Sequence, residues 1–411
     1  MKLISFYSLL VLLMSFNTHL NAQCTDNTCE CIYSLALQED TLWIGTKVGL
    51  FKYNTQNGDK QLYDKTNSPL PNNFVNGIKI DADQSLWIGT YGGGLAHLKE
   101  NQWTIFNKSN SQLVSNNIFF GIEVFKDTLW IGTDKGVAAY DGNAFGIYNQ
   151  DNSILPSAVV FSLANEGDSI MWIAVRGGLY KYNGDWASYT RENSGLPHNL
   201  VYDVTVKGEL KYVSTEQGIV CLDDFGPTTT WMPVSDDKTL VLKYNPKRNA
   251  EYWAGTINGL KKYFFDRIEA TYNTSNSIMT NNYVQALAVD DSDTKWIGTW
   301  GGGVYKLTAS GNFTKLDLNI TSGINENIIT SNLSIYPNPI EDFVEINYTE
   351  FPLETLQKVE IYNLNGQLLK SKMNETSEKL IRVGTSDLTS GIYLLEIHFT
   401  EKTIVKKIIK K

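Results

Sequence analysis

The side chains that most often carry enzyme chemistry are few in this sequence of 411 residues. It contains four histidines, and beyond residue 22 only His97, His198 and His398 remain. None of them lies in a recognisable nucleophile or metal-binding motif. His198 differs because it lies in the turn Pro197-His198-Asn199, ahead of an apolar run, where its imidazole could act as a general base. It is the one weak catalytic candidate, and no cofactor is predicted.

Metal ligands are also sparse in the sequence. The acidic pairs Asp81/Asp83 and Asp291/Asp293 lie in expected turns, where aspartate commonly accepts hydrogen bonds from its own backbone. No paired C-x-x-C motif with nearby histidines is present. We therefore predict no metal site.

The four cysteines have a different meaning if the chain is exported. Cys24, Cys29 and Cys31 lie close together, whereas Cys221 stands alone in an apolar run. An oxidising compartment would allow a bridge from Cys24 to Cys29 or from Cys24 to Cys31, and four cysteines permit three connectivities. Cys221 is expected to be buried as a small apolar residue.

Any site must be positioned by a repeat whose clearest copy is Leu42-Trp43-Ile44-Gly45-Thr46. The motif returns at intervals of 40 to 44 residues, with an aromatic residue at its second position. A period near 42 residues, with β-branched and aromatic runs bounded by glycine, is typical of radially repeated sheets. The aromatic anchors are Trp43, Trp87, Trp130, Trp172, Tyr212, Trp253 and Trp296. Seven anchors predict an all-β fold with a seven-bladed β-propeller.

Each repeat is expected to supply four short strands. In the second repeat, 75–80 is apolar and would form the inner strand, 86–90 the second, 95–98 the third and 103–106 the outer strand. An indole at one place in every blade would fill the gap between neighbouring sheets. The anchors are therefore interpreted as structural.

The candidate ligand-binding residues are those at which the repeats differ. In a propeller, the loops between second and third strands, and those between one outer strand and the next inner strand, open on one face around the central channel. The first set of loops carries Lys47, Tyr91, Asp134, Arg176, Glu216, Asn258 and Trp300, and the second set carries Asn73, Asn117, His198 and Asn282.

Aromatic faces beside amides and a guanidinium suit sugar rings, through apolar stacking and hydrogen bonds. The alternative is a solvated rim of loops that binds nothing. Tyr91, Arg176 and Trp300 are predicted to matter most, since large rings are seldom exposed without a reason and arginine is a planar donor of several hydrogen bonds.

The ends of the chain indicate export. Residues 1–22 begin with Met1-Lys2, continue with an apolar run over 9–14 and end at the small residue Ala22, as a signal peptide does. No later run reaches the roughly twenty apolar residues of a membrane-spanning helix, so the mature chain is expected to lack a transmembrane segment. The formal charge of -9 and the absence of a basic stripe argue against nucleic acid as a partner.

The composition changes after the last repeat. The propeller is expected over 23–317, a linker rich in Asn, Ser and Thr over 318–332, and a compact unit over 333–411. This last unit would be a small immunoglobulin-like β-sandwich, with a hairpin turn at Asn365-Gly366. It opens with Pro337, Asn338 and Pro339, continues with Gly391 and Tyr393, and closes with a basic strand that includes Lys406 and Lys407.

Both parts resemble known families. The repeated Leu-Trp-Ile-Gly-Thr and Gly-Leu pattern over about 31–317 resembles the two-component regulator propeller family, and 333–411 looks like the type A C-terminal sorting domain of the type IX secretion system. The first resemblance implies a sensor, often for carbohydrate, of a membrane-bound kinase, although no kinase follows the propeller here. The second implies that the secretion machinery is a partner and that the folded protein crosses the outer membrane. It also implies cleavage in the linker, and release or surface attachment.

Three functions remain open. The chain is expected to be a secreted or cell-surface propeller that binds a saccharide or another extracellular ligand. The alternatives are a secreted lyase-like propeller enzyme with His198 as base, and a scaffold for protein partners. Glycan binding and polymer degradation by the same purified protein would distinguish the first two.

Overall fold

A computed structural model describes residues 31–156, 158–223, 229–248, 250–318, 334–347, 356–363, 367–374, 380–399 and 403–411. The signal peptide, Cys24, Cys29, most of the linker and the Asn365-Gly366 turn predicted from the sequence lie outside these residues. The chain divides into two compact units, Met1–Ile320 and Thr321–Lys411. Each unit is described below by itself.

The first unit consists of seven four-stranded antiparallel sheets, each built from four consecutive strands. The strands of blades one to four are β1 (Ile32–Gln38), β2 (Thr41–Thr46), β3 (Leu50–Asn54), β4 (Lys60–Tyr63), β5 (Val75–Ile80), β6 (Leu86–Thr90), β7 (Gly94–Lys99), β8 (Gln102–Phe106), β9 (Ile118–Phe125), β10 (Thr128–Thr133), β11 (Gly136–Tyr140), β12 (Phe145–Tyr148), β13 (Val160–Glu166), β14 (Ile170–Val175), β15 (Gly178–Tyr182) and β16 (Trp186–Tyr189).

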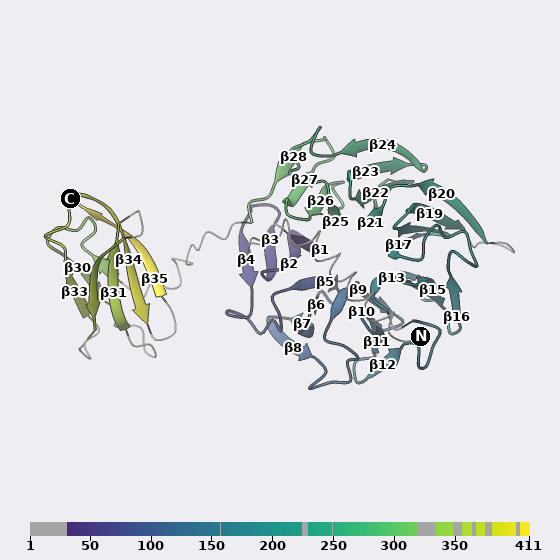
Figure 1. Cartoon of the computed structure of the whole chain (residues 1–411), viewed down its shortest axis with the longest axis horizontal. Helices are drawn as coiled ribbons and strands as arrows, with labels where there is room; N and C mark the ends of the chain where they lie inside the picture. Colours follow the sequence, from purple (N-terminus) through teal and green to yellow (C-terminus); the bar gives the residue numbers. More distant parts are fainter. Residues whose placement is uncertain are drawn as a thin grey trace, which may run out of the picture. The chain divides into compact units, whose positions relative to one another are not determined.

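The strands of blades five to seven are β17 (Val201–Lys207), β18 (Leu210–Thr215), β19 (Gly218–Asp223), β20 (Thr230–Ser235), β21 (Thr239–Tyr244), β22 (Glu251–Thr256), β23 (Gly259–Phe264), β24 (Arg267–Tyr272), β25 (Val284–Val289), β26 (Lys295–Thr299), β27 (Gly303–Leu307) and β28 (Phe313–Lys315). The first strand of each blade lies nearest the centre and contacts the first strands of both neighbouring blades (Figure 1). The predicted seven-bladed propeller is confirmed.

The anchor aromatics form the cores between blades. Trp172 of the fourth blade packs with Val201 and Val213 of the fifth, and it is fully buried. Its Nε1 donates to Glu166 Oε2 at 2.9 Å, so the polar edge of the indole is satisfied. The same arrangement, with each anchor packed against the following blade, recurs at Trp43, Trp87, Trp130, Tyr212, Trp253 and Trp296.

The threonine that ends the repeated motif and a glycine a few residues later, at the start of the third strand, explain the turn between them. In the first blade, Thr46 Oγ1 donates to Gly49 O at 2.8 Å and closes the loop between the second and third strands. The glycine at this turn is required sterically. Gly178 has φ +134°, and a Cβ on it would lie 2.5 Å from Tyr189 O. The threonine hydroxyl therefore stabilises the turn through its hydrogen bond, while glycine is the residue that can adopt the positive φ of the turn.

The ring closes by packing, because no blade combines strands from both ends of the unit. Trp296 of the seventh blade packs with Ile32 and Ile44 of the first, together with Leu316 and Leu318. Leu318 was assigned to the linker from the sequence, yet it is 5% exposed, so the packed core extends to this residue.

Polar contacts reinforce this closing interface. Gln285 Nε2 donates to Ile32 O at 2.7 Å, and Lys60 Nζ lies 3.0 Å from Asp317 Oδ2. Cys31, just ahead of β1, is disulfide-bonded, and its partner lies outside the described residues. Cys221 is a free, buried thiol, as the sequence predicts.

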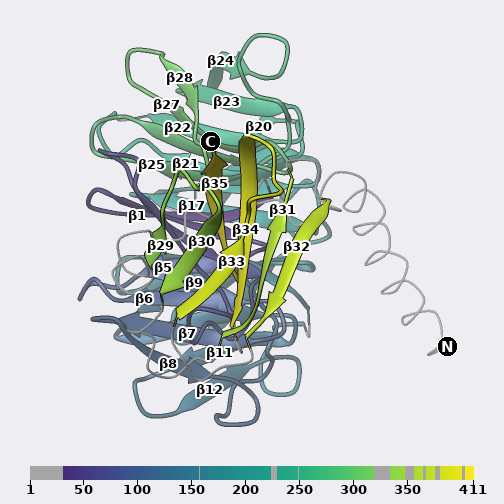
Figure 2. The same ribbon diagram turned by 90° about the vertical axis from the view of Figure 1, so that its left-hand side faces the viewer.

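The second unit is a small β-sandwich. One sheet has the order β29-β30-β33 and the other β32-β31-β34-β35 (Figure 2). Side chains including Val344, Val359 and Leu395 form the core between the sheets. The strands are β29 (Ser334–Tyr336), β30 (Phe343–Asn347), β31 (Leu356–Tyr362), β32 (Leu368–Met373), β33 (Leu380–Gly384), β34 (Gly391–Phe399) and β35 (Thr403–Lys410). Among the described residues, no helix has the length and apolar character that crossing a membrane would require.

Candidate functional site

All seven inner strands show a register shift near their first residue, which adds one residue in six of them and two in β9. In β1, Ile32 pairs with Thr46 and Ser34 with Gly45, so Tyr33 is the additional residue. A bulge of this kind redirects a side chain and often lies beside a functional site. The residues at this level are Tyr33, Asn76, Phe119, Phe161, Tyr202, Leu240 and Gln285. They lie at the inner ends of the blades, and we call this level the channel mouth.

An unbroken series of ring contacts follows the channel mouth through blades seven, one, two and three. Tyr33 lies 5.3 Å from Trp300 and 4.5 Å from Phe74, measured between ring centroids. Phe74 lies 5.6 Å from Tyr91, and Tyr91 lies 6.1 Å from Phe119. The series ends at Tyr283, which lies 5.9 Å from Trp300. We call these six residues the aromatic arc; two of them, Tyr91 and Trp300, were predicted from the sequence.

Charged residues occupy the channel mouth on blades four to six. Tyr202 donates its hydroxyl hydrogen to Glu216 Oε2 at 2.5 Å, and Lys238 Nζ lies 2.9 Å from the same carboxylate oxygen. The ammonium group of Lys238 also lies 5.3 Å from the centroid of the Tyr202 ring. Arg176 has an exposed side chain, its backbone N donates to Val159 O at 3.2 Å, and its positive charge acts on the Tyr202 phenol. We call Arg176, Tyr202, Glu216 and Lys238 the charged arc.

The phenols at the channel mouth remain protonated at neutral pH. Burial raises the pKa of Tyr202 far above its ordinary value, and the hydrogen bond to Glu216 raises it further. Burial likewise raises the pKa of Tyr283 to about 12, with the charge of Glu216 as a second cause. Burial also raises the pKa of Tyr33. These three hydroxyl groups therefore cannot act as bases at neutral pH, and the hydroxyl hydrogen of Tyr202 is already donated to Glu216.

Asp134 lies next to the aromatic arc on the third blade. Its Oδ2 accepts a hydrogen bond of 3.0 Å from Asn117 Nδ2, and Asn117 forms a β-bridge with Tyr91. Its other oxygen, Oδ1, is buried and accepts no hydrogen bond from a described residue. An unsatisfied carboxylate oxygen at the channel mouth can accept a hydrogen bond from a ligand.

Other predicted residues brace the loops. Asn73 Oδ1 accepts from Lys65 N at 2.8 Å, and Asn282 Oδ1 accepts from Thr274 N at 2.8 Å. Asn258 is exposed, with Nδ2 3.4 Å from Asp237 Oδ1. These three asparagines thus have loop partners, and they do not contact the aromatic arc through any ring or hydrogen bond described here. Lys47 is exposed in its loop.

His198 also has a role in its loop. Its Nδ1 accepts a hydrogen bond of 3.0 Å from Leu200 N. Asn72 and Asn281 make the equivalent bond to Phe74 N and Tyr283 N. A neutral imidazole that accepts at Nδ1 carries its proton at Nε2, so neither nitrogen is placed to remove a proton from a ligand. This geometry gives no support to the predicted role as a general base.

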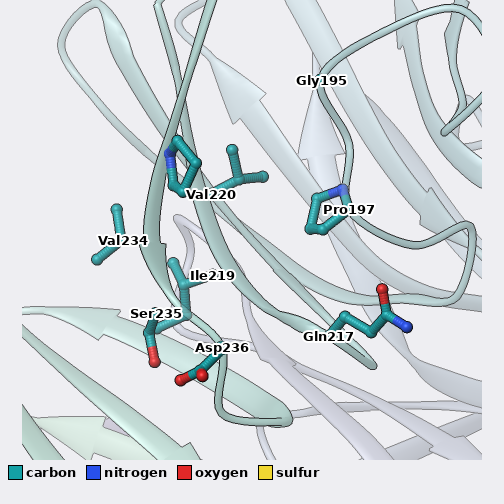
Figure 3. Close-up of a pocket in the computed structure, with 9 residues that line it drawn as sticks. Gly195, Pro197, Gln217, Ile219, Val220, Val234, Ser235 and Asp236 are labelled. Atoms are coloured by element: carbon teal, nitrogen blue, oxygen red, sulfur yellow. The ribbon is translucent and has the colours of Figure 1, made fainter.

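A pocket of about 400 Å³ opens on the fifth blade, in the loops that carry the predicted site. Pro197 and Gln217 lie on one side of it and Val220 and Val234 on the other, with Asp236 at the lower end (Figure 3). Gln217 directly follows Glu216, so the pocket begins next to the charged arc. Its volume is within the usual range for small-molecule sites.

Several channel-mouth residues were missed from the sequence. They are Tyr33, Phe74, Phe119, Phe161, Tyr202, Lys238 and Tyr283. The usable signal is an aromatic residue directly after the first apolar residue of an inner strand, as in Ile32-Tyr33, Val160-Phe161 and Val201-Tyr202. Side chains along a strand point alternately toward the core and away from it, and this residue is at an outward position. From the sequence alone it therefore looks like an ordinary solvent-facing residue, and only the bulge shows where its side chain points.

The predicted sorting residues come together on the second unit. Asn338 Oδ1 accepts from Ile409 N at 3.0 Å, and Asn338 Nδ2 lies 3.4 Å from Lys407 O. Pro337 and Pro339 flank this asparagine, and both follow cis peptide bonds. Gly391 pairs with Lys410, and the buried Tyr393 donates its hydroxyl hydrogen to Thr389 O at 2.7 Å. Lys406 and Lys407 lie on β35 and pair with Leu395 and Leu394.

Comparisons with known proteins agree with this division. Residues 334–411 match the family described as the secretion system C-terminal sorting domain, and residues 69–92 match the two component regulator propeller family. The chain thus contains a sorting domain and a propeller whose second repeat matches the regulator propeller family. It is accordingly a secreted or cell-surface propeller protein, and its sorting domain implies interaction with the type IX secretion machinery. A comparison with curated proteins gives no match.

Solved structures are similar to the propeller in fold. The extracellular domain of a proposed one component system from B. thetaiotaomicron has a TM-score of 0.58 at 16% identity, covering 95% of this chain and 58% of that one. The extracellular domain of a proposed hybrid two component system from B. thetaiotaomicron has a TM-score of 0.56 at 18% identity, covering 94% and 56%. This chain thus spans less than two thirds of either. A streptogramin B lyase has a TM-score of 0.55 at 13% identity, covering 70% and 96%.

Proposed function

We propose that the propeller binds an extracellular saccharide at the channel mouth. The observation that carries this proposal is the aromatic arc, which faces a charged arc on the same face of the propeller. These rings lie apart from the anchor aromatics that hold the blades together. Tyr91 is 40% exposed although it is a large ring, so it has a face available to a ligand.

The chemistry of the mouth suits a sugar. Aromatic faces stack on the apolar C–H face of a pyranose ring, and the phenols of Tyr33 and Tyr283 can donate to its ring or hydroxyl oxygens. Asp134 Oδ1 can accept from a hydroxyl group, and the Arg176 guanidinium can donate to an oxygen or bind an anionic substituent. The pocket beside Glu216 could take a further unit of the same ligand.

The first test replaces the three residues predicted to matter most. A glycan array with the purified mature chain would identify an oligosaccharide, and calorimetry would measure its affinity. We expect Tyr91→Ala, Arg176→Ala and Trp300→Ala together to weaken binding by at least a hundredfold, because each removes a contact worth about 1–2 kcal/mol. Phe265→Ala with Arg267→Ala, both exposed on the sixth blade, is the matched control.

The Trp300→Ala substitution affects stability as well as binding, because Trp300 packs against Tyr33 and Cys31 in a small buried cluster. Its removal will cost some stability, so Tyr91→Ala with Arg176→Ala is a second variant that leaves this cluster intact. Wild-type affinity in both variants would place the site elsewhere. Depolymerisation of the bound glycan by the same preparation would instead favour the lyase-like alternative.

A further inference from the structure

The sorting domain carries a mixed cluster of two carboxylates and an imidazole on the outer face of its larger sheet. Glu360 on β31 pairs directly with Glu396 on β34, and His398 lies two residues further along β34. Their neighbours Val359, Leu395 and Ile397 face the core, so the alternation of the strands places the cluster on the opposite face. Three possible metal ligands thus meet across two adjacent strands.

The three ligand atoms are close enough for one ion. His398 Nε2 lies 3.0 Å from Glu360 Oε2 and 3.4 Å from Glu396 Oε2, and all three atoms lie within 4.8 Å of one another. A tetrahedral zinc ion with bonds of about 2.0–2.2 Å keeps its ligand atoms about 3.3–3.6 Å apart. Small side-chain rotations would therefore bring the cluster to zinc geometry. Within the described residues, this is the one group with such an arrangement.

We propose that Glu360, Glu396 and His398 form a Zn²⁺ site that ties β31 to β34 of the sorting domain. Two carboxylate oxygens and one imidazole nitrogen would leave the fourth position to water, and two negative charges would balance the ion. The site is independent of the saccharide site proposed above.

Hydrogen bonds from neighbouring side chains hold the carboxylate of Glu360 in one orientation, as is usual for a side chain that coordinates a metal. Tyr362 donates its hydroxyl hydrogen to Glu360 Oε2 at 3.0 Å, and Ser371 Oγ lies 3.2 Å from Glu360 Oε1. Partners of this kind hold a metal ligand in place and commonly affect affinity tenfold or more. Lys358 Nζ lies 3.0 Å from Oε1, so the ammonium group and the imidazole approach different oxygens of the carboxylate. Its positive charge will weaken binding relative to a site without it.

The test uses the untagged chain of residues 23–411, with the sorting domain still attached, and zinc chloride. Equilibrium dialysis at pH 7.5 should give one Zn²⁺ per chain, and Co²⁺ in its place should give the visible absorption of a tetrahedral site. His398→Ala should abolish this binding, and Glu396→Gln should weaken it at least tenfold. His198→Ala is the control, because that histidine lies on the propeller.

Glu396 is partly exposed, so Glu396→Gln should still fold if His398→Ala does not. Zinc should also raise the unfolding temperature of the wild-type chain and of His198→Ala, but not that of Glu396→Gln. The absence of stoichiometric zinc binding would overturn the proposal and leave an ordinary polar contact between the imidazole and the two carboxylates. Binding that survives both variants would overturn it as well.

Discussion

Asp293 belongs to a polar network that joins the sixth and seventh blades. Asn245 Nδ2 bonds to Asp293 Oδ1 at 2.5 Å, and Lys295 Nζ lies 2.8 Å from the same oxygen. Arg248 lies 3.1 Å from Asp293 Oδ2. Burial alone would raise the pKa of Asp293, but the bond from Lys295, its charge and the bond from Asn245 outweigh burial and hold the pKa below its ordinary 3.8. The sequence indicated only that Asp293 lies in a turn, whereas the structure shows that its carboxylate bonds to residues of the neighbouring blade.

This lowered pKa predicts an acid-sensitive contribution to stability. A carboxyl group whose pKa is lower in the folded chain stabilises it above the unfolded pKa, and this stabilisation is lost as the pH falls through 3.8 toward the folded value. We expect Asp293→Asn to be less stable than wild type at pH 7, and the difference to shrink between pH 4 and pH 2. Thermal unfolding across this range measures it, with Asp168→Asn on an exposed turn as control. A difference that does not change with pH would contradict the assignment.

At the scale of elements, the packing between two neighbouring blades depends on the anchor aromatic that the first blade places against the second. The second strand carries the anchor because it is buried on both faces, and in β14 five consecutive residues are buried. The neighbouring blades cover its two faces, so an indole there contacts the following blade without reaching solvent. The blades are consequently joined by side-chain packing, with the anchor as the largest component.

The loss of one anchor should therefore be costly. Trp172→Ala is expected to lower the free energy of unfolding by about 3–5 kcal/mol, because it leaves a large cavity and removes the hydrogen bond to Glu166 Oε2. Trp172→Tyr should cost less, since Tyr212 serves as the anchor in the fifth blade. Urea titration measures both changes, and Trp186→Ala on the partly exposed outer strand β16 is the comparison. A loss below about 1 kcal/mol in Trp172→Ala would mean that the anchors are dispensable.

At the scale of the whole molecule, the two units have separate cores. The cluster that includes Val344, Val359 and Leu395 belongs to the sorting domain, and the seven interblade clusters belong to the propeller. The propeller also completes its ring with its own residues, through Trp296, Leu316 and the first blade. Each unit thus has the packing that independent folding requires.

Removal of the sorting domain should consequently change location and leave the propeller folded. We expect a chain that lacks 333–411 to accumulate in the periplasm, because the residues that match the sorting family are gone. Cell fractionation and surface proteolysis measure this, and circular dichroism of the purified truncated protein checks its fold. Normal surface display of the truncated chain would refute the sorting role of the tail.

The architecture could be read from the sequence because its signals are local. The spacing of the anchor aromatics, the alternation along short strands and the Thr and Gly residues at each turn lie within one repeat of about 42 residues. The same holds for the sorting motifs, which match a family over 334–411. Tyr91, Arg176 and Trp300 could be named as candidates because they occupy turn positions that the repeat itself marks, and their role in binding stays a prediction.

The tertiary structure alone decided which residues meet. Tyr33 reaches Trp300 only because the ring closes, and Tyr202 meets Glu216 and Lys238 only because a bulge redirects its side chain. The register of β31 on β34 likewise brings Glu360 to Glu396 and His398 across a separation of more than thirty residues. Pairing registers, bulges and ring closure depend on contacts between distant segments. Local residue patterns therefore determined the elements of this protein, whereas its candidate sites arise from how those elements are joined.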